Sequence, residues 1–290
     1  MKVAIMTDSN SGITQEEGKR LGIFVLPMPF TIDQKEYLED INLTQDKFFD
    51  KLMNGAEVFT SQPAVGEVTK LFDRILKEYD QIVHIPMSSG LSGSCQTALM
   101  LAQEEEYAGR VFVVDSQRIS VTQKWDVLDA IELAKQGKTG EEIHDILMKN
   151  KMNATIYITV NTLEYLKKGG RITPAAAALG GLLKIKPILS IQGEKLDSFQ
   201  KTRTMVKAKQ IMLDTAIKDI RERIDTENED MRNARIMIAY TYDKEQALEF
   251  KQQVQEAFPN HEIMCDPLSL SVACHIGPHS LAIAACKKII

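Results

Sequence analysis

Short apolar runs alternate with amphipathic stretches in the first half of the chain. Buried strands are predicted at residues 3–6, 23–27, 81–85 and 111–114. Helices are predicted between them, after the capping-box pair Thr14 and Glu17, after Thr44, and from Pro63 to about Tyr79. Because strands alternate with helices, we expect a parallel sheet with helices on both faces, and ligand sites at the carboxyl ends of its strands.

The second half has a different pattern. Strands are predicted at residues 155–160, 186–192, 195–200, 235–240, 263–265 and 281–286, and long core-facing helices at 204–224 and 246–257. Gly193 and Glu194 separate two neighbouring strands and predict a hairpin, so this sheet should contain antiparallel pairs. The fold class is therefore α/β, with a parallel sheet between helices followed by a mixed or antiparallel sheet with helices.

The length of 290 residues favours two domains, each large enough to bury a core. Helices predicted at 125–135 and 140–151 complete the first pattern. We therefore predict an amino-terminal domain at residues 1–152 and a carboxy-terminal domain at residues 153–290. Only the change of pattern places this boundary.

Composition and charge exclude several classes of protein. The net charge of −5 at pH 7 lacks the basic footprint of a nucleic-acid-binding protein. The chain turns polar at Thr7, before the length of a signal peptide or a membrane span is reached, which predicts a cytoplasmic protein. The four cysteines form no C-x-x-C pair and have no histidine at zinc-ligand spacing, which predicts buried reduced thiols and no metal.

The segment from Gln81 to Thr97 has the outline of an anion site. An apolar strand runs into the small residues Met-Ser-Ser-Gly-Leu-Ser-Gly-Ser, and a helix follows from about Cys95. Small residues let the backbone approach a ligand, and unpaired amides at a helix start attract negative charge. Ser92 and the amide of Gly93 are the candidate donors. The alternative is that Ser92 or Ser94 only caps the helix.

Similar polar loops follow other predicted strands or precede helices. They are Thr7 to Gly12, Thr60-Ser61-Gln62-Pro63, and Asp115-Ser116. Each can be explained as a local turn that satisfies its own backbone. Together they predict a polar rim on which several strand ends converge.

Two further segments carry candidate residues. His275 lies in the sequence Cys-His-Ile-Gly-Pro, interpreted as a loop, where it could donate to an anion or be a structural histidine. The tract from Gly169 to Leu183 is rich in alanine and glycine, which permits either tight helix packing or a groove beside the backbone.

A serine hydrolase is the enzymatic alternative, because a serine between a strand and a helix resembles a nucleophile elbow. Gly90-Leu-Ser92-Gly-Ser94 places glycine directly after the serine and does not match G-x-S-x-G. The chain also has no P-loop and no dinucleotide-binding glycine motif. We therefore predict a protein that binds an anion and is not an enzyme.

Six ordered motifs resemble the DegV family over about 270 residues. They are Thr7-Asp-Ser9, Thr60-Ser-Gln-Pro63, Ser88-Ser-Gly-Leu-Ser-Gly-Ser94, Val114-Asp-Ser116, Leu163-Glu-Tyr-Leu-Lys-Lys-Gly-Gly-Arg-Ile172 and His275-Ile-Gly-Pro278. The resemblance implies a two-domain protein that binds one long-chain fatty acid such as palmitate. Its tail would be buried in the second domain and its carboxylate held near the interface.

The same resemblance implies a partner and a set of contacts. Members serve as the lipid-binding component of a bacterial fatty acid kinase, whose separate subunit uses ATP to phosphorylate the presented carboxylate for phospholipid synthesis. No cofactor is expected beyond the bound fatty acid, and membrane contact would be transient. The implied carboxylate contacts are Thr60, Ser92, Gly93 and His275, with Ser61, Ser89 and Arg171 as neighbours.

Some features depart from the family pattern or leave the function open. The family commonly has a small residue in place of His279 and a serine in place of Ala64. The basic run Lys167, Lys168 and Arg171 could dock a kinase or be a solvated helix end. A fatty acid carrier without a kinase partner is the alternative function, and the motifs do not define acyl chain length, unsaturation or oligomeric state.

Overall fold

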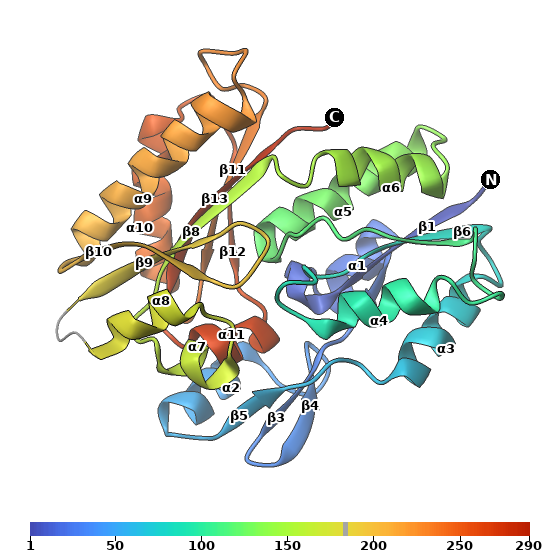
Figure 1. The fold of residues 1–290 in the computed structure, drawn as a ribbon, viewed down its shortest axis with the longest axis horizontal. Helices are drawn as coiled ribbons and strands as arrows, with labels where there is room; N and C mark the ends of the chain where they lie inside the picture. The colour runs from blue at the N-terminus through green and yellow to red at the C-terminus, as the bar shows by residue number, and fades with distance from the viewer. Residues whose placement is uncertain (182–184) are drawn as a thin grey trace.

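The structure, a computed structural model, describes residues 1–181 and 185–290. Two larger sheets lie side by side, each with helices on both faces, and a third, three-stranded sheet lies beside them (Figure 1). Within the described residues, no helix has both the length and the apolar composition that crossing a membrane requires.

The first sheet is entirely parallel, as predicted. Its strands are β1 (Val3–Asp8), β2 (Phe24–Leu26), β6 (Gln81–Ile85) and β7 (Val111–Val113), in the order β2-β1-β6-β7. Its helices are α1 (Gln15–Leu21), α3 (Val65–Ile75), α4 (Gly93–Leu101), α5 (Ser120–Lys135) and α6 (Gly140–Lys149). Because side chains alternate along a strand, Met6 packs toward α3 and α4 while Ile5 packs toward α5 and α6.

The second sheet is mixed, which confirms the predicted fold class. Its strands are β8 (Ala154–Thr159), β9 (Lys186–Ile191), β10 (Asp197–Thr202), β11 (Ala234–Tyr240), β12 (Ile263–Pro267) and β13 (Leu281–Lys287), in the order β10-β9-β8-β13-β11-β12. Only β11 and β12 pair in parallel. The predicted hairpin joins β9 to β10, although its loop is longer than two residues.

Helices cover both faces of this second sheet (Figure 1). One face carries α9 (Met205–Asp219), its continuation as a π-helical turn (Ile220–Ile224), and α10 (Lys244–Ala257). The other face carries α7 (Glu164–Gly169), α8 (Pro174–Ala178) and α11 (Leu270–Ile276). The predicted helices at 204–224 and 246–257 are thus confirmed. The alanine- and glycine-rich tract forms α8 and a short 3-10 turn (Leu179–Gly181), and its last residues, Leu182 and Leu183, lie outside the described part.

The third sheet was not predicted. It consists of β3 (Pro29–Ile32), β4 (Lys35–Leu38) and β5 (Val58–Thr60), all antiparallel, with α2 (Gln45–Met53) beside it. The β3–β4 turn is made by Asp33 and Gln34, both with positive φ. This backbone usually needs Asn-Gly or Asp-Gly, so the sequence carried no hairpin signal. The aromatic core of the sheet packs against Leu270 and Ala273 of α11.

The expectation of a loop around His275 was wrong, because this residue lies in the last turn of α11. The helix is short and contains serine, valine, cysteine and histidine, which have little intrinsic helix propensity. Ser269 caps its start by accepting from the amide of Val272, and Gly277 ends it with φ of 75°. Tertiary contacts therefore hold a helix that local preference does not specify.

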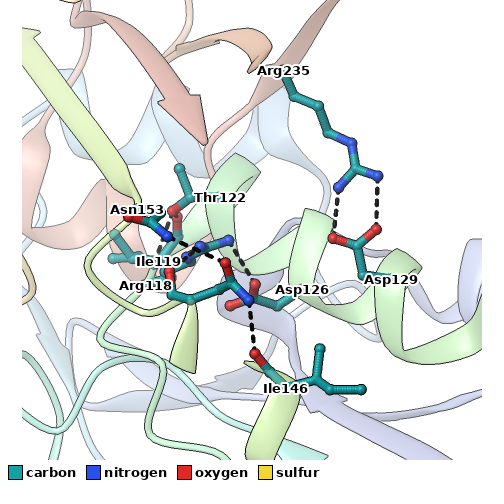
Figure 2. Close-up of polar contacts among 9 residues, drawn as sticks. Arg118, Ile119, Thr122, Asp126, Asp129, Ile146, Asn153 and Arg235 are labelled. Atoms are coloured by element: carbon teal, nitrogen blue, oxygen red, sulfur yellow. Dashed lines mark hydrogen bonds and ion pairs between the residues drawn. The ribbon is translucent and has the colours of Figure 1, made fainter. Parts of the chain in front are cut away.

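Helix α5 connects the two larger sheets through charged and polar side chains. It begins at Ser120, five residues before the predicted start. Asp129 accepts two hydrogen bonds from Arg235 of β11, at 2.6 and 2.7 Å, and Asp126 accepts one from Arg118 at 2.6 Å (Figure 2). The guanidinium of Arg235 also lies 4.0 Å from the ring centroid of Trp125.

A second link runs through Lys124 of the same helix. Its ammonium lies 2.9 Å from Glu17 of α1 and 2.9 Å from Asp266 of β12. The Glu17 carboxylate is therefore engaged by Lys124 and does not accept from the backbone amide of Thr14. Only half of the predicted capping box forms, in which the Thr14 hydroxyl accepts from the amide of Glu17. The contacts of α5 fix the position of the second sheet relative to the first. The predicted boundary at residue 152 stays a prediction.

We predict that Asp126→Asn strongly destabilises the fold. The side chains of Arg118 and Asp126 are 1% and 0% exposed, and removing one charge leaves the other buried without compensation. Burial raises the pKa of Asp126 to about 6 although the charge of Arg118 lowers it, so the carboxylate is ionised at pH 7.5. Urea unfolding at that pH should show a loss of about 3–5 kcal/mol.

The matched control is Asp145→Asn, which removes an exposed carboxylate from α6. Its unfolding free energy should stay close to that of the unchanged chain. Equal effects of the two substitutions would contradict a central role for the buried pair.

Candidate functional site

One cavity of about 240 Å³ lies between the second sheet and the polar loops of the first. Its apolar lining consists of Met28, Met87, Leu91, Ile119, Val121, Ile156, Ile158, Leu166, Ile191, Leu196, Ala239, Leu268, Val272, Ile276, Ala282 and Ala284. Its polar lining consists of Asn10, Thr60, Ser61, Gln62, Ser92, Gly93, Ser120, Arg171, Ser271 and His275. The cavity therefore combines a long apolar wall with clustered hydrogen-bonding groups.

Small side chains on the middle strands of the second sheet leave room for this cavity. Ala282 of β13 lies between Ala239 of β11 and Ile158 of β8, and Ala284 pairs with Ile156 on the same face. These alanines face the helices α7, α8 and α11. Larger residues at these positions would fill the space, so the alanines shape an apolar groove along the sheet.

Most of the polar lining groups gather where the cavity meets solvent. Ser61, Gln62 and Gly93 are exposed, whereas the alanines of the sheet are buried. The cavity thus has a polar mouth and a largely apolar interior. This arrangement suits an amphipathic ligand with one polar end.

Thr60 and His275 meet at this mouth. Thr60 ends β5, and its hydroxyl oxygen lies 2.8 Å from Nε2 of His275 in α11. Nδ1 of His275 lies against Gly169, where a Cβ atom would come within 1.9 Å, and it has no partner among the described residues. Only glycine leaves space for the ring at this position.

The imidazole of His275 is neutral at pH 7. Burial, and secondarily the charge of Arg171, lower its pKa to about 4. An N–H on Nδ1 would be buried without an acceptor, which costs free energy. We therefore assign the proton to Nε2, where it is donated to Thr60. The hydroxyl hydrogen of Thr60 then remains available to a ligand.

Ser92 and Gly93 contribute the start of helix α4. The hydroxyl of Ser92 accepts from the amide of Ser94 at 3.2 Å and lies 2.8 Å from the hydroxyl of Ser94. Gly93 is the first helical residue, and a Cβ atom there would lie 3.1 Å from the side-chain oxygen of Gln62. The unpaired amides and dipole of the helix favour an anion beside these residues.

Arg171 brings a positive charge to the cavity. Its Nε donates to the carbonyl of Leu91 at 3.1 Å, and one terminal nitrogen donates to the carbonyl of Gly169 at 2.6 Å. These bonds fix the guanidinium, which is half-buried. Because His275 is neutral, Arg171 is the one cation among the described lining residues, and it favours an anionic ligand.

The structure brings most of the predicted site residues together. Thr60, Ser61, Ser92, Gly93, Arg171 and His275 all line this cavity. Ser89 does not belong to the lining: its hydroxyl donates to Asp115 at 2.6 Å. His279 also lies elsewhere, with its ring against Tyr242 and its Nδ1 3.8 Å from Asp243.

The predicted basic run divides into two parts. Arg171 faces the cavity, while Lys168 lies on the surface, 3.2 Å from Glu57 and over the ring of Phe59. Lys167 and Lys168 are exposed, whereas Arg171 is half-buried in the lining of the cavity. The use of the exposed lysines in docking stays a prediction.

Several lining residues were missed from the sequence. Asn10 belongs to a loop that was noted as polar without singling out this side chain. Ser120 was missed because the predicted helix began too late, and Ser271 because α11 was interpreted as a loop. Gln62 lay inside a noted motif, so only its neighbours were named.

Among the residues that the structure describes, no serine hydroxyl is hydrogen-bonded to a histidine. Ser92 bonds to Ser94, and His275 bonds to Thr60. Within residues 1–181 and 185–290, no cluster of histidine, cysteine, aspartate or glutamate has the geometry of a metal site. Cys95, Cys274 and Cys286 are buried free thiols, and Cys265 is half-buried.

Glu39 holds helix α11 in place. Its two carboxylate oxygens accept from the amides of Leu270 and Ser271, at 2.7 and 2.9 Å, at the start of this helix. Burial raises the pKa of Glu39 to about 7, although both amide hydrogen bonds lower it. This carboxylate positions the helix that carries both Ser271 and His275, and it directly follows β4 of the sheet that also carries Thr60.

We predict that Glu39→Gln loosens the start of α11. The carboxamide offers one oxygen to two amides and turns its NH₂ group toward the second donor. Above pH 7, where Glu39 is ionised, hydrogen exchange at the Leu270 and Ser271 amides should accelerate by about tenfold or more, as expected when about one hydrogen bond is lost. The control is Glu36→Gln on β4, an exposed position, and unchanged exchange in Glu39→Gln would contradict this role.

The same substitution has a defined effect on pH dependence. Between its ordinary pKa of 4.5 and about 7, Glu39 is protonated in the folded state and ionised in the unfolded state. The folded chain binds more protons, so this group makes the unfolding free energy fall as pH rises through the window. Glu39→Gln should remove that contribution to the slope.

Comparisons with known proteins agree over nearly the whole chain. A model of the DegV family, described as uncharacterised proteins, matches residues 2–288. Protein DegV of Bacillus subtilis is 29% identical over 290 residues, covering 99% of this chain and 100% of the relative. A DegV domain-containing protein of Clostridium perfringens is 31% identical over 288 residues, covering 97% and 96%.

Solved structures show the same fold. A DegV family protein of Thermus thermophilus, described by its fatty acid binding, is 30% identical with a TM-score of 0.88, covering 99% of this chain and 100% of that chain. The structure of Bacillus subtilis DegV, described as a fatty acid binding protein, is 27% identical with a TM-score of 0.86, also covering 99% and 100%.

Proposed function

The chain belongs to the DegV family, and we propose that it binds one long-chain fatty acid, such as palmitate, in the cavity described above. The observation that carries this proposal is the pairing of a polar, cationic mouth with an apolar interior. Two structural neighbours described as fatty acid binding proteins support it. No cofactor or metal is part of the proposal.

The carboxylate lies at the mouth. Thr60 supplies a hydroxyl hydrogen, Ser92 and Gly93 supply the start of α4, and Arg171 supplies a positive charge. His275 orients Thr60, and Ser61 lies at the edge. These groups prevent the carboxylate from being buried without partners, which would be costly.

The tail lies against the second sheet, beside the alanines of β11 and β13. Burying about 15 methylenes contributes on the order of 12 kcal/mol before the costs of association, whereas a charge-assisted hydrogen bond contributes about 1.5–3 kcal/mol. The tail therefore dominates affinity, and the polar groups determine where the carboxylate points. In this arrangement residues 153–290 supply most of the tail-binding surface, and residues 1–152 most of the polar mouth.

We infer that the bound acid is presented to a separate ATP-dependent kinase subunit in the cytoplasm. The exposed residues around the mouth make the carboxylate accessible to a partner. The described residues place no base against Ser92, and the sequence has no nucleotide-binding motif. Phosphorylation is thus assigned to the partner, and this chain is the binding component. A carrier without a kinase is the alternative outcome.

The position of the carboxylate can be tested through His275. A carboxylate at the mouth should raise the pKa of this imidazole from about 4 toward neutrality, because a nearby negative charge favours the protonated ring. NMR titration between about pH 5 and 8 should show His275 titrating in the palmitate complex.

The control ligand is hexadecanol, which has the same tail without the charge. It should leave His275 neutral across the same range. The same titration with both ligands, or no binding of palmitate, would contradict the proposed carboxylate site.

The kinase proposal can be tested with Ser92→Ala. This change removes a carboxylate contact and the helix cap, which costs about 1 kcal/mol of stability. Because the tail dominates binding, palmitate affinity should fall by less than about tenfold, while phosphorylation by an added fatty acid kinase subunit falls much further.

Ser89→Ala is the matched control, because this neighbouring serine lies off the cavity. It should leave both binding and phosphorylation unchanged. Abolished binding in Ser92→Ala with normal stability would contradict the division between tail and head group. Absence of phosphorylation in the unchanged chain would favour the carrier.

A further inference from the structure

A second polar cluster lines the cavity away from its mouth. Asn10, Ser120 and Ser271 are 1%, 4% and 4% exposed, and all three belong to the lining. The side-chain oxygen of Asn10 accepts from the hydroxyl of Ser271 at 2.6 Å. The side-chain amide nitrogen of Asn10 (Nδ2) and the hydroxyl of Ser120 have no partner among the described residues.

Ser271, to which Asn10 is bonded, lies about one helical turn from the mouth, and Ser120 begins α5, which packs against the turn that carries Asn10. Ser271 precedes His275 by four residues on α11, which corresponds to roughly 6 Å along a helix. Ser269, beside Ser271, caps the same helix start, so this end of α11 is fixed. A ligand whose carboxylate lies at His275 therefore passes the cluster within its first few carbon atoms.

An unsubstituted acyl chain leaves these groups unsatisfied. A buried donor without an acceptor is costly, and most such groups in folded proteins have a partner. Ser120 also has φ of 54°, a strained backbone for a residue other than glycine, of the kind that often marks a functional position. The unpartnered buried groups and the strained backbone of Ser120 both point to a polar ligand atom beside Asn10 and Ser120 when the cavity holds its ligand.

We propose that Asn10 and Ser120, held by Ser271, form a subsite for a hydroxyl group near the carboxyl end of a hydroxylated fatty acid. The oxygen of such a hydroxyl has two lone pairs, so it accepts from the side-chain amide of Asn10 and from the hydroxyl of Ser120 and satisfies both donors at once. This inference rests on the proposed function, because it takes the carboxylate to lie at the mouth. It adds a substrate class to that site.

The test is calorimetric titration of the delipidated protein with β-hydroxypalmitate, each enantiomer separately, and with palmitate. One enantiomer should bind about three- to tenfold more tightly than palmitate, as one or two net hydrogen bonds would give. ω-Hydroxypalmitate, whose hydroxyl lies at the far end of the chain, should show no such gain.

Ser120→Ala should bring the ratio of the β-hydroxypalmitate and palmitate affinities to about one. Ser116→Ala is the matched control, because this serine is also buried but does not line the cavity. It should keep the preference of the unchanged chain. Urea unfolding of both variants establishes that they are folded.

Equal affinities for palmitate and both β-hydroxypalmitate enantiomers in the unchanged chain would overturn the subsite. In that case an ordered water between Asn10 and Ser120 in the palmitate complex would account for the unpaired groups. If palmitate binds but β-hydroxypalmitate does not bind more tightly, the proposed function stands without the subsite. If neither palmitate nor β-hydroxypalmitate binds, both the subsite and the proposed function are overturned.

Discussion

The buried ionic contacts of helix α5 determine how the two larger sheets lie relative to each other. Asp129 holds Arg235 of the second sheet, Lys124 joins α1 to β12, and Asp126 pairs with Arg118 beside them. Charges taken out of water are tolerated only with close partners, so this geometry has little freedom. The cavity lies between parts that these contacts hold together, and its shape depends on them.

The chemistry of the cavity follows from where each part of the fold contributes. The second sheet supplies alanines that leave an apolar groove, and the first supplies the start of α4. The three-stranded sheet supplies Thr60 at the mouth, and the turn after its strand β4 supplies Glu39, which fixes α11. Polar groups therefore line the cavity at two depths, with Arg171 providing the charge at the mouth.

Patterns local in sequence predicted much of this structure. Apolar runs identified the strands of both larger sheets, and the serine-glycine loop identified the start of α4. The family resemblance, confirmed by the match over residues 2–288, named Thr60 and His275, which the structure brings to one hydrogen bond. Ser89 was predicted to lie near the site because it is close to Ser92 in the sequence, but its hydroxyl donates to Asp115.

The missed features depend on contacts between distant segments. The β3–β4 turn uses Asp33 and Gln34 where the turn type favours glycine, and α11 is held by Glu39, more than 200 residues away. Neither the β3–β4 turn nor helix α11 can be predicted from the few residues on either side of it in the sequence. The second polar cluster was missed for the same reason, since Asn10 and Ser271 meet only through the tertiary fold.

The central claim is that a fatty acid occupies this cavity, and native mass spectrometry of the purified protein tests it most directly. Spectra under native and denaturing conditions should differ by the mass of one long-chain fatty acid, and the released molecule identifies the preferred chain. A protein that carries no lipid and also fails to bind added fatty acids would contradict the account.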